Sequence, residues 1–71
     1  MVNVEKLIDK IKSKGITIFK LAKVIGVNTS TVYRRFNNPD TFTIREVNCI
    51  VKLLCLSSAE AVAIFFNENV A

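Results

Sequence analysis

A chain of 71 residues is long enough for one domain, residues 1–71, and too short for a second. Although 51% of the residues are hydrophobic, no run of eighteen apolar residues occurs, so we expect no membrane span. The sequence has no histidine, no glycine-rich phosphate loop and no nucleophile beside a base, so we expect no enzymatic activity and no small-molecule substrate.

The formal net charge of +4 is unevenly distributed along the chain. Residues 1–45 contain nine basic and three acidic residues, a net charge of +6, whereas residues 46–71 contain one basic and three acidic residues, a net charge of −2. A basic part of this kind is typical of a protein that faces a polyanion with one side. The alternative is a lysine-rich face that is simply solvated.

The first predicted helix runs from a cap at Asn3 to about Lys14. Its apolar residues repeat at i, i+3, i+4 and i+7, which defines one face of a helix. That face contains Val4, Leu7, Ile8 and Ile11. Gly15 ends this helix, and Thr17 is a good N-cap for the next one.

The stretch 18–37 begins with a short predicted helix, Ile18 to Ile25, that contains no helix breaker. The small side chain of Ala22 allows another helix to cross it closely. Gly26 ends the helix, because glycine adopts the left-handed backbone conformation at little cost. Val27 follows, and its apolar side chain is expected to fill the space between the two helices.

Asn28 is a good N-cap for the next predicted helix, about Thr29 to Asn37. Val32 and Phe36 are four residues apart and therefore share the buried face of this helix. Two helices joined by a glycine-containing turn form a helix-turn-helix unit, whose second helix can enter the major groove of DNA. The alternative is an ordinary helical hairpin that binds nothing. The core of the unit is predicted to contain Leu21, Ala22, Ile25, Val27, Val32 and Phe36.

A turn is expected at residues 37–40, since Pro39 disfavours helix at the residue before it. Phe42 is expected to anchor the following loop in the core. Thr43 and Glu46 form a capping box that starts a fourth helix. The predicted buried face of this helix contains Ile44, Val47, Ile50, Val51 and Leu54.

A second capping box, Ser57 with Glu60, opens the last predicted helix, which extends to about Phe66. Its inward-facing residues are predicted to be Ala61, Ile64 and Phe65. A small domain cannot cover every face of its last helix, so we expect apolar residues near the C-terminus to form a homodimer interface. The residues expected there are Phe65, Phe66 and Val70. The alternative is that they close the core of the monomer.

Strand signals are absent, and the predicted fold is an all-α, compact bundle of five short helices. Cys49 and Cys55 are six residues apart in or near the fourth helix, and no histidine completes a metal-binding set. Both thiols are therefore expected to be reduced, small and buried. The sequence predicts neither a metal site nor a cofactor.

The chain resembles the phage repressor and Cro-like (Xre-type) helix-turn-helix proteins over roughly residues 5–66. The residues that carry the resemblance are Leu21, Ala22, Gly26, Val27, Val32, the Tyr33-Arg34-Arg35-Phe36-Asn37 run and, downstream, residues 42–46 with Ile50, Leu53 and Leu54. The resemblance implies a lambda-repressor-like domain. It also implies a sequence-specific transcriptional regulator of phage or prophage origin that binds an operator in double-stranded DNA and blocks or redirects transcription.

The resemblance also implies which residues contact DNA. The residues expected to face base edges are Thr29, Ser30, Tyr33 and Arg34. Arg34 can pair bidentately with guanine, whereas short hydroxyl side chains discriminate less strongly. Contacts with the DNA backbone are expected from Thr17, Lys20, Lys23, Asn28, Asn37, Asn38 and Arg45.

Two positions depart from the family pattern. Ile18 stands where many members carry a polar residue that contacts the DNA backbone. The backbone N–H group of Ile18, or the neighbouring Thr17, Lys20 or Lys23, is expected to bind the phosphate instead. Arg35 stands where the residue is often apolar, so Phe36 must provide the packing there.

A second class of function remains open on the sequence alone. The chain can be a small interaction module, an anti-repressor or modulator that uses the helix-turn-helix scaffold to bind a partner protein. The apolar C-terminal helix suits such a role. With no targeting segment, either protein is expected in the cytoplasm of a bacterial host cell.

Overall fold

The computed structural model describes residues 2–66, which form five α-helices and one short 3₁₀ helix. The elements are α1 (Val4–Ser13), α2 (Ile18–Ile25), α3 (Thr29–Asn37), η1 (Pro39–Thr41), α4 (Ile44–Leu53) and α5 (Ser58–Phe65). The described residues contain no strand, which confirms the predicted all-α bundle of five short helices. None of these helices has both the length and the apolar character that crossing a bilayer requires.

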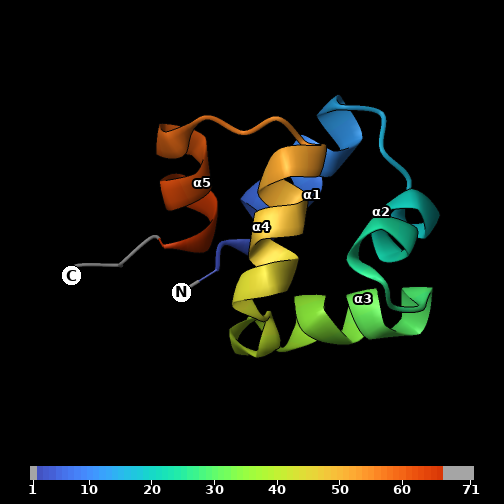
Figure 1. The fold of residues 1–71 in the computed structure, drawn as a ribbon. Helices are drawn as coiled ribbons and strands as arrows, with labels where there is room; N and C mark the ends of the chain where they lie inside the picture. Colours follow the sequence, from blue (N-terminus) through green and yellow to red (C-terminus); the bar gives the residue numbers. More distant parts are fainter. Residues whose placement is uncertain (1, 67–71) are drawn as a thin grey trace.

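The helices pack around α4 (Figure 1). In the view of Figure 1, α2 and α5 flank α4 on opposite sides, α1 lies behind it and α3 runs across one end. A backbone hydrogen bond from the N–H of Asn3 to the carbonyl of Ile64, 2.6 Å long, ties the N-terminal segment to α5. The helix-turn-helix unit, α2 and α3, thus lies on the side of the bundle away from α5.

Each α-helix begins at a residue whose side-chain oxygen accepts a hydrogen bond from the N–H three positions later. These N-caps are Asn3, Thr17, Asn28, Thr43 and Ser57. Both predicted capping boxes are complete, because the Glu46 and Glu60 side chains accept in turn from the N–H of their caps. Local chemistry therefore defines where the helices start.

The ends of α1 and α4 share one geometry, the Schellman motif. After α1, Gly15 has φ 69° and donates to the Lys12 carbonyl, and Ile16 donates to the carbonyl of Ile11. After α4, Cys55 stands in the place of glycine with φ 51°. The burial expected of Cys55 is wrong: its side chain is exposed, because a residue at this position projects beyond the helix end.

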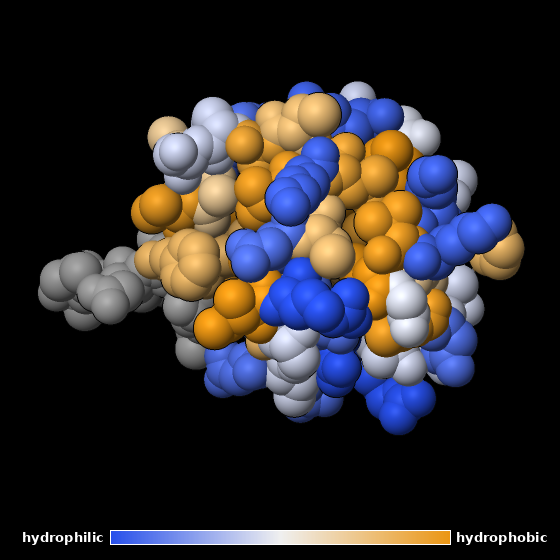
Figure 2. Space-filling view, in the orientation of Figure 1, coloured by the Kyte–Doolittle hydropathy of each residue, from blue (hydrophilic) through white to orange (hydrophobic). Residues whose placement is uncertain are grey.

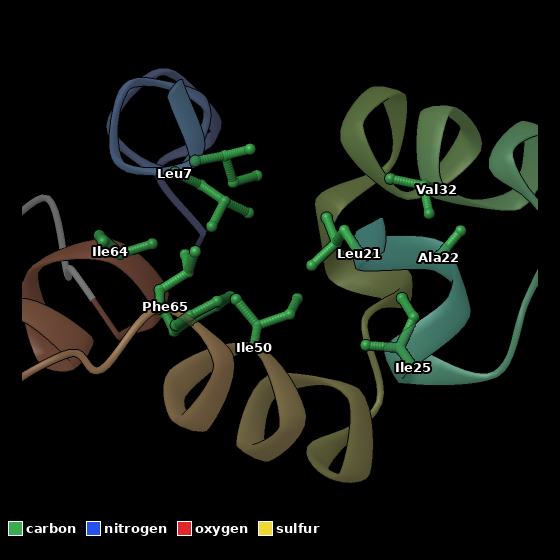
Figure 3. Close-up of a cluster of buried hydrophobic side chains, with 10 residues drawn as sticks. Leu7, Leu21, Ala22, Ile25, Val32, Ile50, Ile64 and Phe65 are labelled. Carbon is green, nitrogen blue, oxygen red and sulfur yellow. The ribbon is translucent and has the colours of Figure 1, made fainter. Parts of the chain in front are cut away.

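The core draws on all five α-helices (Figure 3). Its buried residues are Leu7, Ile11, Leu21, Ala22, Ile25, Val32, Ile50, Leu54, Ile64 and Phe65. The predicted burial of Leu21, Ala22, Ile25 and Val32 is confirmed, and Val27 and Phe36 are half-buried against this cluster. Phe42 is half-buried, with its ring 6.2 Å from that of Phe65, and it anchors the loop before α4 as expected.

Two predicted burials have different outcomes at the ends of helices. Ile44 was expected in the buried face of α4, but it is 81% exposed. The reason is its place as the first residue of α4, at the edge of the bundle, where it lines a shallow groove with Pro39 and Phe66. Phe65, by contrast, is only 4% exposed and belongs to the core of the monomer.

Candidate nucleic-acid interface

The helix-turn-helix unit is held together by small and medium-sized apolar side chains. In Figure 3 the side chain of Val32 on α3 points toward Ala22 on α2. Val32 is fully buried and Ala22 is 2% exposed. Gly26, with φ 79°, reverses the chain between the helices, a conformation that costs glycine little. The helices can approach closely here, and the other face of α3 is left toward solvent.

The outer face of α3 carries the residues predicted to contact bases. Ser30, Tyr33 and Arg34 are exposed, and Thr29 is half-buried. The Arg34 side chain makes no hydrogen bond or ion pair within residues 2–66, so its guanidinium donors face solvent. The Tyr33 ring is 54% exposed and meets the edge of Phe36 at a centroid distance of 6.2 Å. Packing on Phe36 therefore orients the Tyr33 ring.

Asn28 organises the hydroxyl groups at the start of α3. Its side-chain oxygen accepts hydrogen bonds from the hydroxyl of Ser30 at 2.7 Å, from the hydroxyl of Thr31 at 2.9 Å and from the Thr31 N–H at 3.0 Å. The Ser30 proton is thus committed within the protein, and the oxygen presents lone pairs outward. The amide group of Asn28 keeps its two N–H donors, which suit a phosphate.

Two grooves flank the packing of α2 against α3 and collect six of the predicted contact residues. One groove, of about 540 Å³, is lined in part by Thr17, Tyr33 and Asn37. The other, of about 430 Å³, is lined in part by Lys23, Asn28 and Thr29. Each groove therefore brings together predicted contact residues from both helices of the unit or from their caps.

Two further predicted backbone contacts, Lys20 and Asn38, are not among the residues that line these grooves. Lys20 is exposed in the first turn of α2, and its N–H donates to the hydroxyl of Thr17 at 3.1 Å. Asn38 is exposed at the end of α3, where its carbonyl accepts from the N–H and the hydroxyl of Thr41 at 2.9 and 2.6 Å. Its side chain makes no hydrogen bond within the described part of the chain, so its amide remains available to a phosphate.

Two arginines have partners inside the domain that the sequence did not reveal. Arg35 donates through Nε and Nη2 to the two carboxylate oxygens of Glu46, at 3.0 and 3.2 Å. Arg45 donates through Nη2 to the backbone carbonyl of Ile25 at 2.8 Å. If Arg45 keeps this bond, its removal leaves the salt dependence of DNA binding unchanged, whereas the loss of a phosphate contact would reduce that dependence.

Glu46 is the one charged residue of the described chain that is buried, at 2% exposure. Burial raises the pKa of Glu46, but the hydrogen bonds from Arg35 and from the Thr43 N–H, with the charges of Arg35 and Arg45, lower it by more. The pKa of Glu46 therefore lies below its ordinary value, and the carboxylate stays ionised at neutral pH.

Apolar exposure is the feature of this surface that the sequence predictions missed. Phe19, on α2, is 72% exposed and lines the smaller groove beside Lys23. Helical spacing contains the signal, since Phe19 falls on the face of α2 away from Leu21 and Ile25. An exposed aromatic ring beside a lysine can pack on a deoxyribose or on a partner protein.

The residues expected at a dimer interface have separate outcomes. Phe65 is 4% exposed and packs against the ring of Phe42, so it closes the core of the monomer, which is the alternative that the sequence offered. Phe66 is 62% exposed and remains a candidate. Val70 lies outside the described residues.

No protein-family model matches the chain, and comparisons with curated proteins and with solved structures found no match. What can be inferred about function therefore rests on the residues and geometry described above.

Proposed function

We propose that this protein is a sequence-specific DNA-binding transcriptional regulator, of the phage or prophage Cro and repressor type, that inserts α3 into the major groove of an operator. The observation that carries the proposal is the outer face of α3, where Ser30, Tyr33 and Arg34 are exposed and Arg34 has no partner within residues 2–66. Lys20 and Lys23 on α2 extend this surface with positive charge. A regulator of this kind acts in the cytoplasm of its bacterial host.

Affinity and specificity come from different side chains in this proposal. Lys20, Lys23 and the amide groups of Asn28, Asn37 and Asn38 contact phosphates, and the release of counterions favours binding to any sequence. Arg34 pairs with O6 and N7 of a guanine. Ser30, whose proton is held by Asn28, accepts from the amino group of adenine or cytosine.

Sites for such proteins are commonly read by two copies of the domain, and we propose a homodimer that includes Phe66. Phe66 and Ile44 are 62% and 81% exposed and line one groove of about 210 Å³. A symmetric dimer would set two α3 helices about 34 Å apart on a near-palindromic site. We expect Phe66→Ser to shift the sedimentation coefficient toward that of a monomer, with Val24→Ser on α2 as the control. A monomeric unsubstituted protein would contradict the dimer.

Salt-dependent binding is the experiment that tests the proposal. The purified protein is titrated with the DNA that flanks its own gene and with a shuffled duplex of equal length, at several salt concentrations. We expect tight binding with a preference for the natural sequence, and a slope of log affinity against log salt that gives the number of phosphates contacted. Weak binding without preference would refute the proposal.

The exposed apolar side chains favour one other function, binding of a partner protein. Phe19, Val62 and Phe66 are 72%, 55% and 62% exposed, and Figure 2 shows apolar patches interspersed with hydrophilic side chains on the face it presents. An anti-repressor or modulator would depend on Phe66 and bind DNA weakly, whereas a DNA-binding regulator depends on Arg34 and on salt. The same titration therefore separates the two functions.

A further inference from the structure

The first turn of α4 contacts both helices of the helix-turn-helix unit through neighbouring charged side chains. Glu46 reaches the last turn of α3, where Arg35 donates to its two oxygens at 3.0 and 3.2 Å. Arg45 reaches the end of α2, where it donates to the carbonyl of Ile25 at 2.8 Å. One turn of helix thus bonds to the C-terminal ends of both α2 and α3.

The geometry of the Arg35–Glu46 pair makes it directional. The planar guanidinium group forms two bonds to one carboxylate, an arrangement that fixes orientation as well as distance. The carboxylate is tied to its own helix too, because Oε1 accepts from the N–H of Thr43 at 3.0 Å. Glu46 therefore joins the start of α4 rigidly to α3.

Neither arginine is free to leave its partner at low cost. If Arg35 turned to a phosphate, Glu46 would keep a charge at 2% exposure with only the Thr43 N–H as a donor, which is unfavourable. If Arg45 left, the carbonyl of Ile25 would lose its donor in a residue that is fully buried, and the last carbonyls of a helix have no partner within the helix. Both bonds are therefore expected to persist when DNA binds.

We propose that Arg35, Arg45 and Glu46 are positioning residues that hold α2 and α3 at the angle required to read the major groove, and that neither arginine contacts DNA. This inference rests on the proposed function. The adjacent arginines of α3 then have different tasks, since Arg34 faces solvent and reads the site while Arg35 faces α4 and orients the helix.

The test compares Arg35→Met and Arg45→Met with Lys52→Met, a matched control that removes the same charge. Lys52 is exposed in the last turn of α4, at the other end of that helix from Arg45. Each variant is titrated with the natural flanking DNA and with the shuffled duplex, over a range of salt. The titrations are done at a temperature at which circular dichroism shows every variant to be folded.

We expect both arginine variants to keep the salt slope of the Lys52→Met control, because no phosphate contact has been lost. We expect their preference for the natural sequence to fall by about tenfold, because a tilted α3 weakens the contacts with base edges. The control should retain the full preference.

Glu46→Gln and the double variant Arg35→Met/Glu46→Gln separate positioning from stability. Glutamine preserves the capping box, so Glu46→Gln is expected to fold and to lose part of the preference. The double variant removes the buried unpaired charge and should recover stability relative to Arg35→Met, while its preference for the natural sequence stays low.

Two results would overturn the inference. A salt slope lower by about one unit in Arg35→Met or Arg45→Met than in the control would show that the arginine contacts a phosphate. An unchanged preference in all the variants would show a role in stability alone. If the unsubstituted protein does not prefer the natural DNA to the shuffled duplex, the proposed function fails and this inference fails with it. That result comes from the unsubstituted protein alone, so it is distinguishable from a failure of the inference, which only the variants can show.

Discussion

Replacing Cys55 with glycine is expected to stabilise the protein. Cys55 follows α4 with φ 51°, in the left-handed region that L-residues with a Cβ atom seldom adopt. Its N–H donates to the Lys52 carbonyl at 3.2 Å, and the N–H of Leu56 donates to that of Val51 at 3.0 Å. Gly15 fills the equivalent position after α1, with φ 69°. The fold therefore contains the same helix end twice, once with glycine and once without.

The magnitude follows from two opposing effects. The left-handed conformation costs a residue with a Cβ atom about 1–2 kcal/mol, and glycine removes that cost. Glycine also loses more conformational freedom on folding than cysteine does, and this loss reduces the stabilisation by about 0.5–1 kcal/mol. The net gain for Cys55→Gly is about 0.5–1 kcal/mol, and in a domain of this size it raises Tm by about 3–6 °C.

Thermal unfolding followed by circular dichroism measures the effect, with Cys55→Ala as the matched control. Alanine removes the thiol, whose weak bond to the Lys52 carbonyl spans 3.7 Å, but keeps the Cβ atom and its strain. We expect Cys55→Ala to unfold close to the natural protein and Cys55→Gly to unfold at a higher temperature. The reciprocal substitution, Gly15→Ala, should lower stability by about 0.5–1 kcal/mol, because the added Cβ has no atom within 4 Å and only the backbone conformation is strained.

Equal Tm values for Cys55→Gly and Cys55→Ala would refute the reasoning. They would show that the strain relieved by glycine at the end of α4 is no larger than the conformational entropy that glycine loses on folding. A Gly15→Ala variant as stable as the natural protein would lead to the same conclusion at the end of α1.

Three further predictions concern DNA binding and pH. Arg34→Ala should weaken the binding free energy by about 1–3 kcal/mol on the natural flanking DNA and by much less on shuffled DNA in the same titration. Equal losses of binding free energy on both DNAs would show that Arg34 contacts no base. Lys20→Ala should weaken binding to both DNAs alike and lower the salt slope by about one, and an unchanged slope would exclude a phosphate contact. The ion pair with Lys10, with the bond from the Ser57 N–H, lowers the pKa of Glu60 from 4.5 to about 2. Because this pKa is lower in the folded state, the stabilisation is complete above about pH 4.5 and is lost as the pH falls toward 2. Glu60→Gln should flatten the dependence of urea-unfolding stability on pH in that window, and a curve parallel to that of the natural protein would show that the pair contributes nothing.

The bounds of the helix-turn-helix unit could be predicted because they depend on short-range interactions. α2 and α3 begin and end where the sequence predicted, at residues 18–25 and 29–37. Thr17 and Asn28 each accept a hydrogen bond from an N–H three residues later, and Gly26 adopts its conformation without a tertiary partner. Such interactions act within a few residues and leave a direct pattern in the sequence.

Burial at the ends of helices could not be predicted with the same accuracy. The predicted buried face of α4 has Ile44 at one edge and Ile50 at the other, yet Ile50 is fully buried and Ile44 is 81% exposed. Spacing shows which face of a helix is apolar, but it does not show how far the neighbouring helices extend along that face. Phe65 illustrates the same limit, since its position beside Phe42 is set by how α5 packs on the loop before α4.

The sequence by itself determined the number of α-helices, the residues at which they begin, the tight turn between α2 and α3 and most of the core, because caps, glycines and apolar spacing act locally. Only the tertiary structure decided which charged side chains remain available to a ligand. Arg34 and Arg35 are neighbours of identical chemistry, but Arg35 lies within reach of Glu46, eleven residues away, and Arg45 reaches Ile25 across twenty residues. These partners meet only once the helices have packed, because the distance between residues far apart in the chain is set by the packing angle of their helices.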